Sequence, residues 1–176
     1  GLGYGLDPDR EGATVWEYRI GQGSALGGIE WGFAVDTEKA YFANSDYLTR
    51  EPGGLAAVRL RTGELVWFAD AHEPVCEGCS PALLAAVTVI PGAVFSGAYD
   101  GLFRAYSSQD GSVLWEYDTN GSYETVNGVD AKGGSINGPG PVVVDGMVYV
   151  NSGYAAFGGR AGNVLLAFSV DEGLDE

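Results

Sequence analysis

The stretch AAVTVIPGAVFSGAYDGLFRAYSSQDGSVLWEYD, residues 85–118, decides the fold. Three turns divide it, at Pro91-Gly92, at Tyr99-Asp100-Gly101 and at 108–111, and each contains a glycine that accepts the positive φ of a tight hairpin. Between the turns, β-branched and aromatic residues fill runs of about five or six residues, the usual length of a strand. The stretch predicts four antiparallel strands, a unit that cannot bury both of its faces alone.

The end of this unit recurs with a spacing of about 50 residues, which is typical of β-propeller blades. LAAVRLRTGELVW at 55–67 and LFRAYSSQDGSVLW at 102–115 are two copies of it. An earlier copy ends at Trp16, and a later one, GNVLLAFSVDEG at 162–173, stops before its tryptophan. The three complete copies therefore end at Trp16, Trp67 and Trp115.

We predict an all-β fold because no segment shows sustained helical periodicity. The architecture is a partial β-propeller of four-stranded antiparallel blades within a single domain, 1–176, with about thirteen strands in about three and a half blades. The predicted units are blade ends at 3–20, complete blades at 31–69 and 83–118, and an incomplete last blade at 141–173. Because this array leaves unpaired edge strands, either the missing part of a larger propeller or a second copy of the chain would complete it.

Composition indicates a globular protein and excludes some partners. The chain is 45% apolar, and its 29 glycines lie between hydrophobic runs, as turns require. Its net charge of −15 disfavours nucleic acid and anionic membranes as partners. No apolar run reaches the roughly 18 residues of a membrane span, and the start lacks a signal-peptide pattern, as expected for a mature or cut chain.

The two cysteines, Cys76 and Cys79, are spaced C-E-G-C. Ser80 follows them where a haem attachment site needs histidine, and no second pair is present for a four-cysteine zinc site. Two alternatives stay open, a local disulfide in an oxidising compartment or two reduced thiols. The only histidine, His72, is expected to be an exposed loop residue without a partner.

The repeat L-x-A-[YFL]-x-x-x-[TD]-G-x-x-x-W resembles the blades of the pyrroloquinoline quinone (PQQ) dehydrogenases and their cofactor-free relatives, over essentially the whole chain. GGIEWG at 27–32, residues 86–115 and residues 126–154 are most similar to the polyvinyl alcohol dehydrogenases of that group. The resemblance implies an eight-bladed propeller of which this chain is the C-terminal part. It also implies a PQQ- and Ca²⁺-dependent enzyme, periplasmic or secreted, that oxidises a secondary or polymeric alcohol by hydride transfer to PQQ and passes electrons to cytochrome c.

Four residues are assigned to the cofactor by this resemblance. The motif G-G-x-x-W-G contains Gly27, Gly28 and Trp31. The resemblance implies that PQQ stacks on the flat ring of this tryptophan. The alternative for Trp31 is packing between blades. Lys132 lies in the longest connection, and the resemblance implies that it pairs with a carboxylate of the cofactor. The glycines around it could equally form simple turns.

Four further residues are assigned to the metal and to the chemistry. Asp46, with Asn44 nearby, is the implied calcium ligand, because calcium prefers hard oxygen donors; the alternative is a solvated loop residue. Glu73 is the implied general base that takes the hydroxyl proton of the alcohol, and Asp70 is the second candidate.

A second function of a different class is a cofactor-free propeller with PQQ-like repeats that acts as a binding or scaffold module. The departures from the family pattern at Asp46 and Glu73 favour it, and so does the missing half of the propeller, which supplies further ligands in the dehydrogenases. If the dehydrogenase interpretation holds, we expect the isolated chain to be inactive.

Overall fold

The computed structural model describes residues 1–170, which form fifteen strands and two short 3-10 turns, η1 (Pro8–Arg10) and η2 (Ala156–Gly158). The strands are β1 (Leu2–Asp7), β2 (Ala13–Arg19), β3 (Ala34–Val35), β4 (Lys39–Ala43), β5 (Gly54–Arg59), β6 (Leu65–Asp70), β7 (Thr88–Ile90), β8 (Ala93–Gly97), β9 (Leu102–Ser107), β10 (Val113–Asp118), β11 (Ser122–Tyr123), β12 (Ala131–Lys132), β13 (Val142–Val144), β14 (Met147–Ser152) and β15 (Val164–Ser169). Residues 171–173 of the predicted last blade lie outside the described residues. Within 1–170, no helix is long and apolar enough to cross a membrane.

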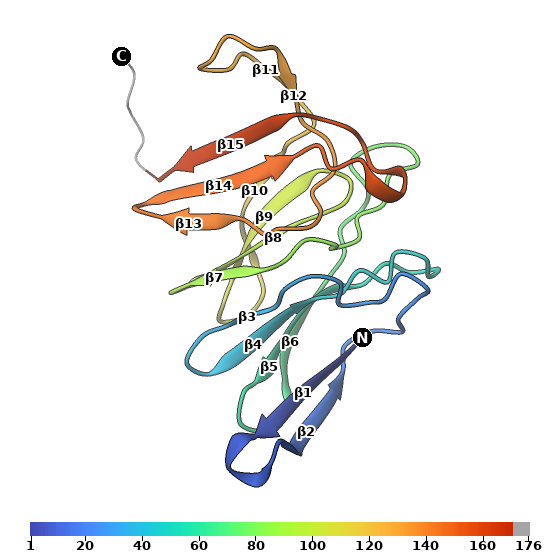
Figure 1. The fold of residues 1–176 in the computed structure, drawn as a ribbon, viewed down its shortest axis with the longest axis vertical. Helices are drawn as coiled ribbons and strands as arrows, with labels where there is room; N and C mark the ends of the chain where they lie inside the picture. Colours follow the sequence, from blue (N-terminus) through green and yellow to red (C-terminus); the bar gives the residue numbers. More distant parts are fainter. Residues whose placement is uncertain (171–176) are drawn as a thin grey trace.

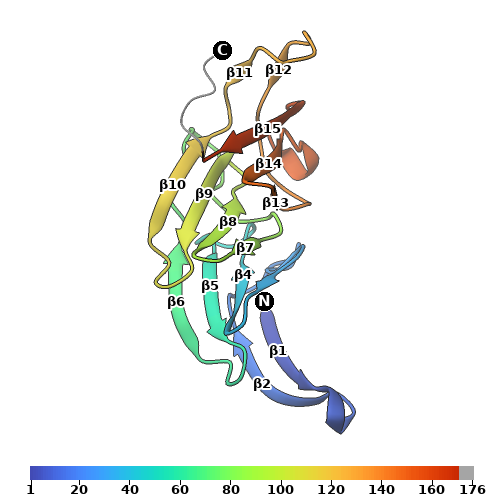
Figure 2. The ribbon, with the colours of Figure 1, turned by 90° about the vertical axis from the view of Figure 1, so that its left-hand side faces the viewer.

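Four antiparallel sheets follow one another along the molecule (Figure 1). Their strand orders are β1-β2, β3-β4-β5-β6, β7-β8-β9-β10 and β13-β14-β15, so neighbours in sequence are neighbours in space. In Figure 2 the sheets fan out along an arc, as blades do around a propeller axis. The predicted all-β, partial propeller fold is confirmed.

Two details differ from the sequence-based expectation. The 119–140 connection contains a two-stranded hairpin, β11-β12, in which Ser122 pairs with Lys132. The second blade was predicted to begin at residue 31, but its innermost strand is short, since β3 spans only Ala34–Val35. The residues before it contact the third blade instead, because the carbonyl of Gly32 accepts a hydrogen bond from the N–H of Val87 at 3.0 Å.

The repeated tryptophans join each blade to the next. The indole of Trp16 donates from Nε1 to the carbonyl of Leu60 at 2.8 Å, in the β5–β6 turn of the second blade. Trp67 makes the equivalent bond to the carbonyl of Ser108 at 3.2 Å, in the β9–β10 turn of the third. The sequence repeat of about 50 residues therefore corresponds both to one blade and to one equivalent contact between that blade and the next.

Glycine is required beneath these indoles. Gly63 and Gly111 have φ values of 70° and 76°, and a Cβ there would lie 2.7 Å and 2.6 Å from ring atoms of the overlying tryptophan. Trp115 packs edge-on against Phe168 of the last blade, with ring centroids 5.0 Å apart.

The hydrophobic core lies between the blades. Three of its clusters fill the successive interfaces. They include Phe42 and Val58, then Tyr41 and Trp67, then Phe103 and Ile136. Connections contribute to the core as well: Ile136 enters it from the 119–140 connection and lies where a Cβ on Gly97 would be only 2.3 Å away. The interiors of the blades therefore fix the positions of the connections.

Candidate functional site

The long connections gather on one edge of the sheets, here called the loop edge. Strands β2, β4, β6, β8, β10 and β14 all end there, because successive strands of a blade are antiparallel. The connections 20–33, 44–53, 71–87 and 153–163 leave from this edge (Figure 1, right), as do the 119–140 connection and the β8–β9 turn. The other tight turns lie on the opposite edge. Binding and catalytic residues are commonly carried by loops that a rigid scaffold positions.

The loop edge holds most of the unpaired buried polar atoms. Within residues 1–170, four buried side-chain atoms have no hydrogen-bond partner: Asn44 Oδ1, His72 Nδ1, Ser96 Oγ and Asn120 Oδ1. Three of them belong to residues that lie one or two positions after the end of a strand: Asn44 after β4, His72 after β6 and Asn120 after β10. Because buried polar atoms are normally paired, this edge has hydrogen-bonding capacity that the chain itself does not use.

Trp31 presents a half-exposed, anchored ring at this edge. Its side chain lies just before β3 and is 54% exposed, unlike buried Trp67. Its Nε1 donates to Oδ1 of Asn137 at 2.8 Å, and the same oxygen accepts from the N–H of Gly138 at 2.6 Å. The indole is thus fixed by the 119–140 connection while one side stays open. Such a ring fits the predicted role of a stacking floor for a planar quinone.

Gly27 and Gly28 shape the loop that leads to Trp31. Gly27 has a φ of 99° and closes a tight turn with Ser24. Gly28 accepts a hydrogen bond from the N–H of Ser45 at 2.7 Å, and a Cβ on it would lie 2.9 Å from Oδ1 of Asn44. Gly27 is therefore needed for its backbone conformation and Gly28 for close packing. Their contact with a cofactor stays a prediction.

Asn44 and Asp46 lie together at the end of β4, and both are buried. The Asp46 carboxylate accepts the N–H groups of Gln22 and Gly23, at 2.9 Å and 2.7 Å, so it anchors the preceding connection. Burial raises the pKa of Asp46, but hydrogen bonds from the Asn44 amide and from these N–H groups outweigh it and hold the pKa below its usual range. Asp46 is therefore a buried carboxylate and not a solvated loop residue.

These two residues alone do not form a calcium site. Calcium takes about six to eight oxygen ligands, whereas Asp46 offers two oxygens that already accept N–H groups. Of the side-chain oxygens of these two residues, only Oδ1 of Asn44 is without a hydrogen bond and free to act as a metal ligand. Among the residues that the structure describes, no group of three or more His, Cys, Asp or Glu could hold a metal. A calcium role for Asp46 and Asn44 stays a prediction that needs ligands from elsewhere.

The two predicted proton acceptors lie at the surface. Asp70 is the last residue of β6, pairs in register with Gly54 and is exposed. Glu73 is exposed in the following connection. Within residues 1–170, no hydrogen bond or ion pair orients either carboxylate toward Trp31, so their catalytic role stays a prediction.

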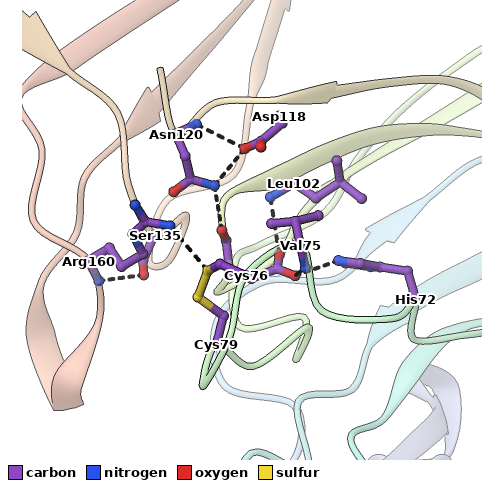
Figure 3. Close-up of a disulfide and its surroundings, with 10 residues drawn as sticks. His72, Val75, Cys76, Cys79, Leu102, Asp118, Asn120, Ser135 and Arg160 are labelled. Atoms are coloured by element: carbon purple, nitrogen blue, oxygen red, sulfur yellow. Dashed lines mark hydrogen bonds and ion pairs between the residues drawn. A yellow bond between two sulfur atoms is a disulfide. The ribbon is translucent and has the colours of Figure 1, made fainter. Parts of the chain in front are cut away.

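His72, between them, is buried and paired, and the expectation of an exposed histidine is wrong. Its side chain is 6% exposed, and Nε2 lies 2.8 Å from Oδ2 of Asp100, whose side chain is fully buried. The same oxygen accepts the N–H of Val75 at 3.1 Å, and Oδ1 accepts the N–H of Leu102 at 3.2 Å (Figure 3). Asp100 thus ties the connection after β6 to the β8–β9 turn of the next blade.

Cys76 and Cys79 form a disulfide beside this pair (Figure 3). Of the two open alternatives, the structure has the disulfide. Nη1 of Arg160, from the β14–β15 connection, lies 3.1 Å from Sγ of Cys76, and its backbone N–H donates to Ser135. The cysteine loop is therefore held against the third blade through Asp100 and against the last blade through Arg160.

Lys132 lies apart from these groups, on β12 of the projecting hairpin (Figure 1, top). It is exposed and lines an open cavity of about 740 Å³, together with Tyr123, Glu124, Asp130 and Asn163. The structure brings Trp31, Asn137, His72 and Asp100 to the loop edge but does not join Lys132 to them. Its pairing with a cofactor carboxylate stays a prediction.

Fold and loop edge together define a partial β-propeller with PQQ-type repeats. Residues 4–133 match the PQQ_2 family, described as outer membrane protein assembly factor BamB. The chain belongs to this family.

The chain is also similar to named enzymes. It is 47% identical over 186 residues to a polyvinylalcohol dehydrogenase from Pseudomonas sp. and 44% identical over 190 residues to one from Sphingopyxis sp. (strain 113P3). Each match covers 97% of this chain but 29% of the relative, so the chain spans less than a third of these curated relatives. The predicted resemblance to PQQ-type alcohol dehydrogenases is confirmed.

Solved structures share the fold. Quinohemoprotein alcohol dehydrogenase from Comamonas testosteroni matches with a TM-score of 0.64 at 23% identity, over 97% of this chain and 22% of that one. BamB from Moraxella catarrhalis matches with a TM-score of 0.58 at 19% identity, over 91% and 41%. At these identities the likeness establishes the propeller architecture alone.

Proposed function

We propose that this chain is part of a quinoprotein alcohol dehydrogenase and that its loop edge forms one side of the PQQ site. The single observation that supports this most is the anchored, half-exposed Trp31 within a chain that is 47% identical to a polyvinylalcohol dehydrogenase. The substrate would be a secondary or polymeric alcohol, and the immediate electron acceptor after PQQ would be a cytochrome c.

When bound, PQQ would act as the two-electron oxidant, and the residues of this chain would bind and orient the PQQ ring. Trp31 offers the stacking face, and Asn137 keeps that face from rotating. Asp46 and its N–H donors hold the connection that leads to Trp31 in one conformation. A calcium ion, a periplasmic or secreted location, and completion by the rest of an eight-bladed propeller belong to the same proposal.

A titration of the chain with PQQ and calcium, followed by tryptophan fluorescence, tests this proposal. We expect quenching in the wild type and its loss in Trp31→Ala, because Trp31 is the half-exposed indole of the site. Trp115→Phe is the matched control, since Trp115 packs on Phe168 away from the loop edge and its removal leaves the quenching of Trp31 in place. Absence of quenching in the wild type would overturn the proposal.

The second candidate is a propeller without cofactor that acts as a binding or scaffold module. The match to the family described as an outer membrane assembly factor favours it, and so does the use of Asp46 as a loop anchor. This candidate predicts no PQQ-dependent quenching, so the same titration separates the two.

A further inference from the structure

We propose that Nδ1 of His72 is the atom that accepts the hydroxyl proton of the alcohol, and that Asp100 is the positioning residue that orients the imidazole. The inference rests on the proposed function and replaces the exposed Glu73 and Asp70 as its proton acceptor. Three observations carry it: the pairing of Nε2 with Asp100, the burial of both side chains, and the lack of a partner for Nδ1.

The contacts of Asp100 determine which imidazole nitrogen carries the hydrogen. Its Oδ1 accepts from the N–H of Leu102, and its Oδ2 accepts from the N–H of Val75. Both oxygens therefore act as acceptors, and Nε2 of His72 must be the donor at 2.8 Å. In a neutral imidazole, one nitrogen donates and the other accepts. Nδ1 is consequently left with a free lone pair.

The orientation is rigid because Asp100 cannot turn away. Besides the two backbone donors on its carboxylate, its carbonyl accepts from Nδ2 of Asn120 at 2.7 Å (Figure 3). The carboxylate also stabilises the positive charge that appears on the ring when Nδ1 takes a proton. A fixed acceptor on Nε2 and a free lone pair on Nδ1 are the arrangement that a general base needs.

The charged groups around the ring belong to three connections. Asp100 faces it from the β8–β9 turn, Glu73 follows it on its own loop, and Arg160 lies beyond, against the disulfide. Nε2 of His72 thus faces one fixed carboxylate, and Nδ1 has no hydrogen-bond partner among residues 1–170. Nδ1 is buried in this structure, so the side chains around it must move apart for an alcohol to reach it. Hydrogen bonds of catalytic bases often tighten only with substrate present.

The proposed step balances as follows. The O–H bond of the alcohol breaks and its proton goes to Nδ1, which turns the neutral imidazole into an imidazolium. The carbinol C–H bond breaks, and its hydrogen leaves with the electron pair as hydride to the quinone, the two-electron oxidant. The remaining electron pair on oxygen forms the C=O bond of the product. The alcohol is oxidised, the quinone is reduced, and Asp100 keeps its charge throughout.

Long-range ¹H–¹⁵N correlation spectra of the whole chain test this directly, because His72 is the only histidine and its ring signals need no assignment. At neutral pH we expect a pyrrole-type signal for Nε2 and a pyridine-type signal for Nδ1. The reverse pattern, or two pyrrole-type signals from a doubly protonated ring, would overturn the inference without any variant.

Two variants and one addition sharpen the test. Asp100→Asn offers an amide N–H to Nε2 and should reverse the two signal types, whereas Glu73→Gln on the same loop should leave them unchanged. If Asp100→Asn fails to fold, the wild-type spectrum still decides. With PQQ and calcium present, 2-propanol should shift the Nδ1 signal, and an unchanged signal would overturn the catalytic role.

The fluorescence titration keeps this inference separate from the proposed function. Quenching of Trp31 by PQQ together with the wrong tautomer overturns the His72 assignment alone. The correct tautomer without quenching overturns the quinone site, and the catalytic step falls with it.

Discussion

Nε2 of His72 lies 2.8 Å from Oδ2 of Asp100, and this pair joins the 71–87 connection, which follows the second blade, to the β8–β9 turn of the third. Asp100 is fully buried and accepts two backbone N–H groups besides the imidazole. A carboxylate in this position holds the disulfide loop against the third blade. It therefore has consequences for stability as well as for chemistry.

Replacing Asp100 by alanine should strongly destabilise the chain. The N–H groups of Val75 and Leu102 and the imidazole of His72 would all lose their buried acceptor. We expect the free energy of unfolding to fall by about 3–5 kcal/mol, measured by urea denaturation. Asp130→Ala, in the exposed loop before β12, is the control and should change it far less. Equal losses in the two variants would contradict the structure.

The architecture followed from local signals in the sequence. In residues 85–118, glycine turns and β-branched runs determine both the strands and their order, because each strand pairs with its neighbour in sequence. The β11-β12 hairpin escaped prediction, since two-residue strands in a segment rich in glycine and asparagine have no periodicity. The shortening of β3 depends on a contact between Gly32 and Val87, 55 residues away, which no local pattern records.

The candidate site was predictable only where a motif marked it. Trp31 stands out because it follows two glycines and falls outside the repeat of the other tryptophans. Asp100 sits in a Y-D-G turn, where aspartate is common for local reasons, and its partner His72 is 28 residues earlier. Asn137 is 106 residues from Trp31. Pairings across blades of this kind arise from the assembled fold and leave no signal in a single sequence.

Removing the anchor of Trp31 should weaken quinone binding modestly. Asn137→Ala deletes the acceptor for the indole N–H, and one such hydrogen bond contributes about 1 kcal/mol, so we expect PQQ affinity to fall about fivefold by calorimetry. Trp31→Phe keeps a flat ring without the N–H and should lose a similar factor, with little further loss in the double variant. Additive losses would show that Asn137 acts on PQQ by another route.

The disulfide should stabilise the chain by a small amount. It closes a loop of only four residues from Cys76 to Cys79, for which chain entropy gives about 2 kcal/mol. We expect the double variant Cys76→Ser/Cys79→Ser to lose about this much in urea denaturation. The reducing agent TCEP provides the control: it should lower the stability of the wild type toward that of the variant and leave the variant unaffected.

Asp46 should make the stability depend on pH in the acidic range. Its pKa is lower in the folded chain than the ordinary value of 3.8, so its contribution is fully present above that value and is lost as the pH falls through the lower, folded value. Asp46→Asn should therefore cost about 1–3 kcal/mol at pH 7, with the difference from wild type shrinking toward pH 3. A difference that is constant from pH 7 to pH 3 would contradict the assigned direction.

The glycines beneath the tryptophans separate backbone strain from contact between blades. Gly12, Gly63 and Gly111 occupy equivalent turns with φ values of 76°, 70° and 76°, so alanine should be strained equally in all three. A Cβ at Gly12 meets nothing within 4 Å, whereas at Gly63 and Gly111 it would lie within 3 Å of an indole. We expect Gly12→Ala to cost about 1 kcal/mol and the other two to cost about 2–4 kcal/mol in urea denaturation. Because the extra cost arises only from the displaced Trp16 or Trp67, it should be accompanied by a red shift of tryptophan emission that Gly12→Ala lacks. Equal costs at all three positions would mean that these indoles do not hold the blades together.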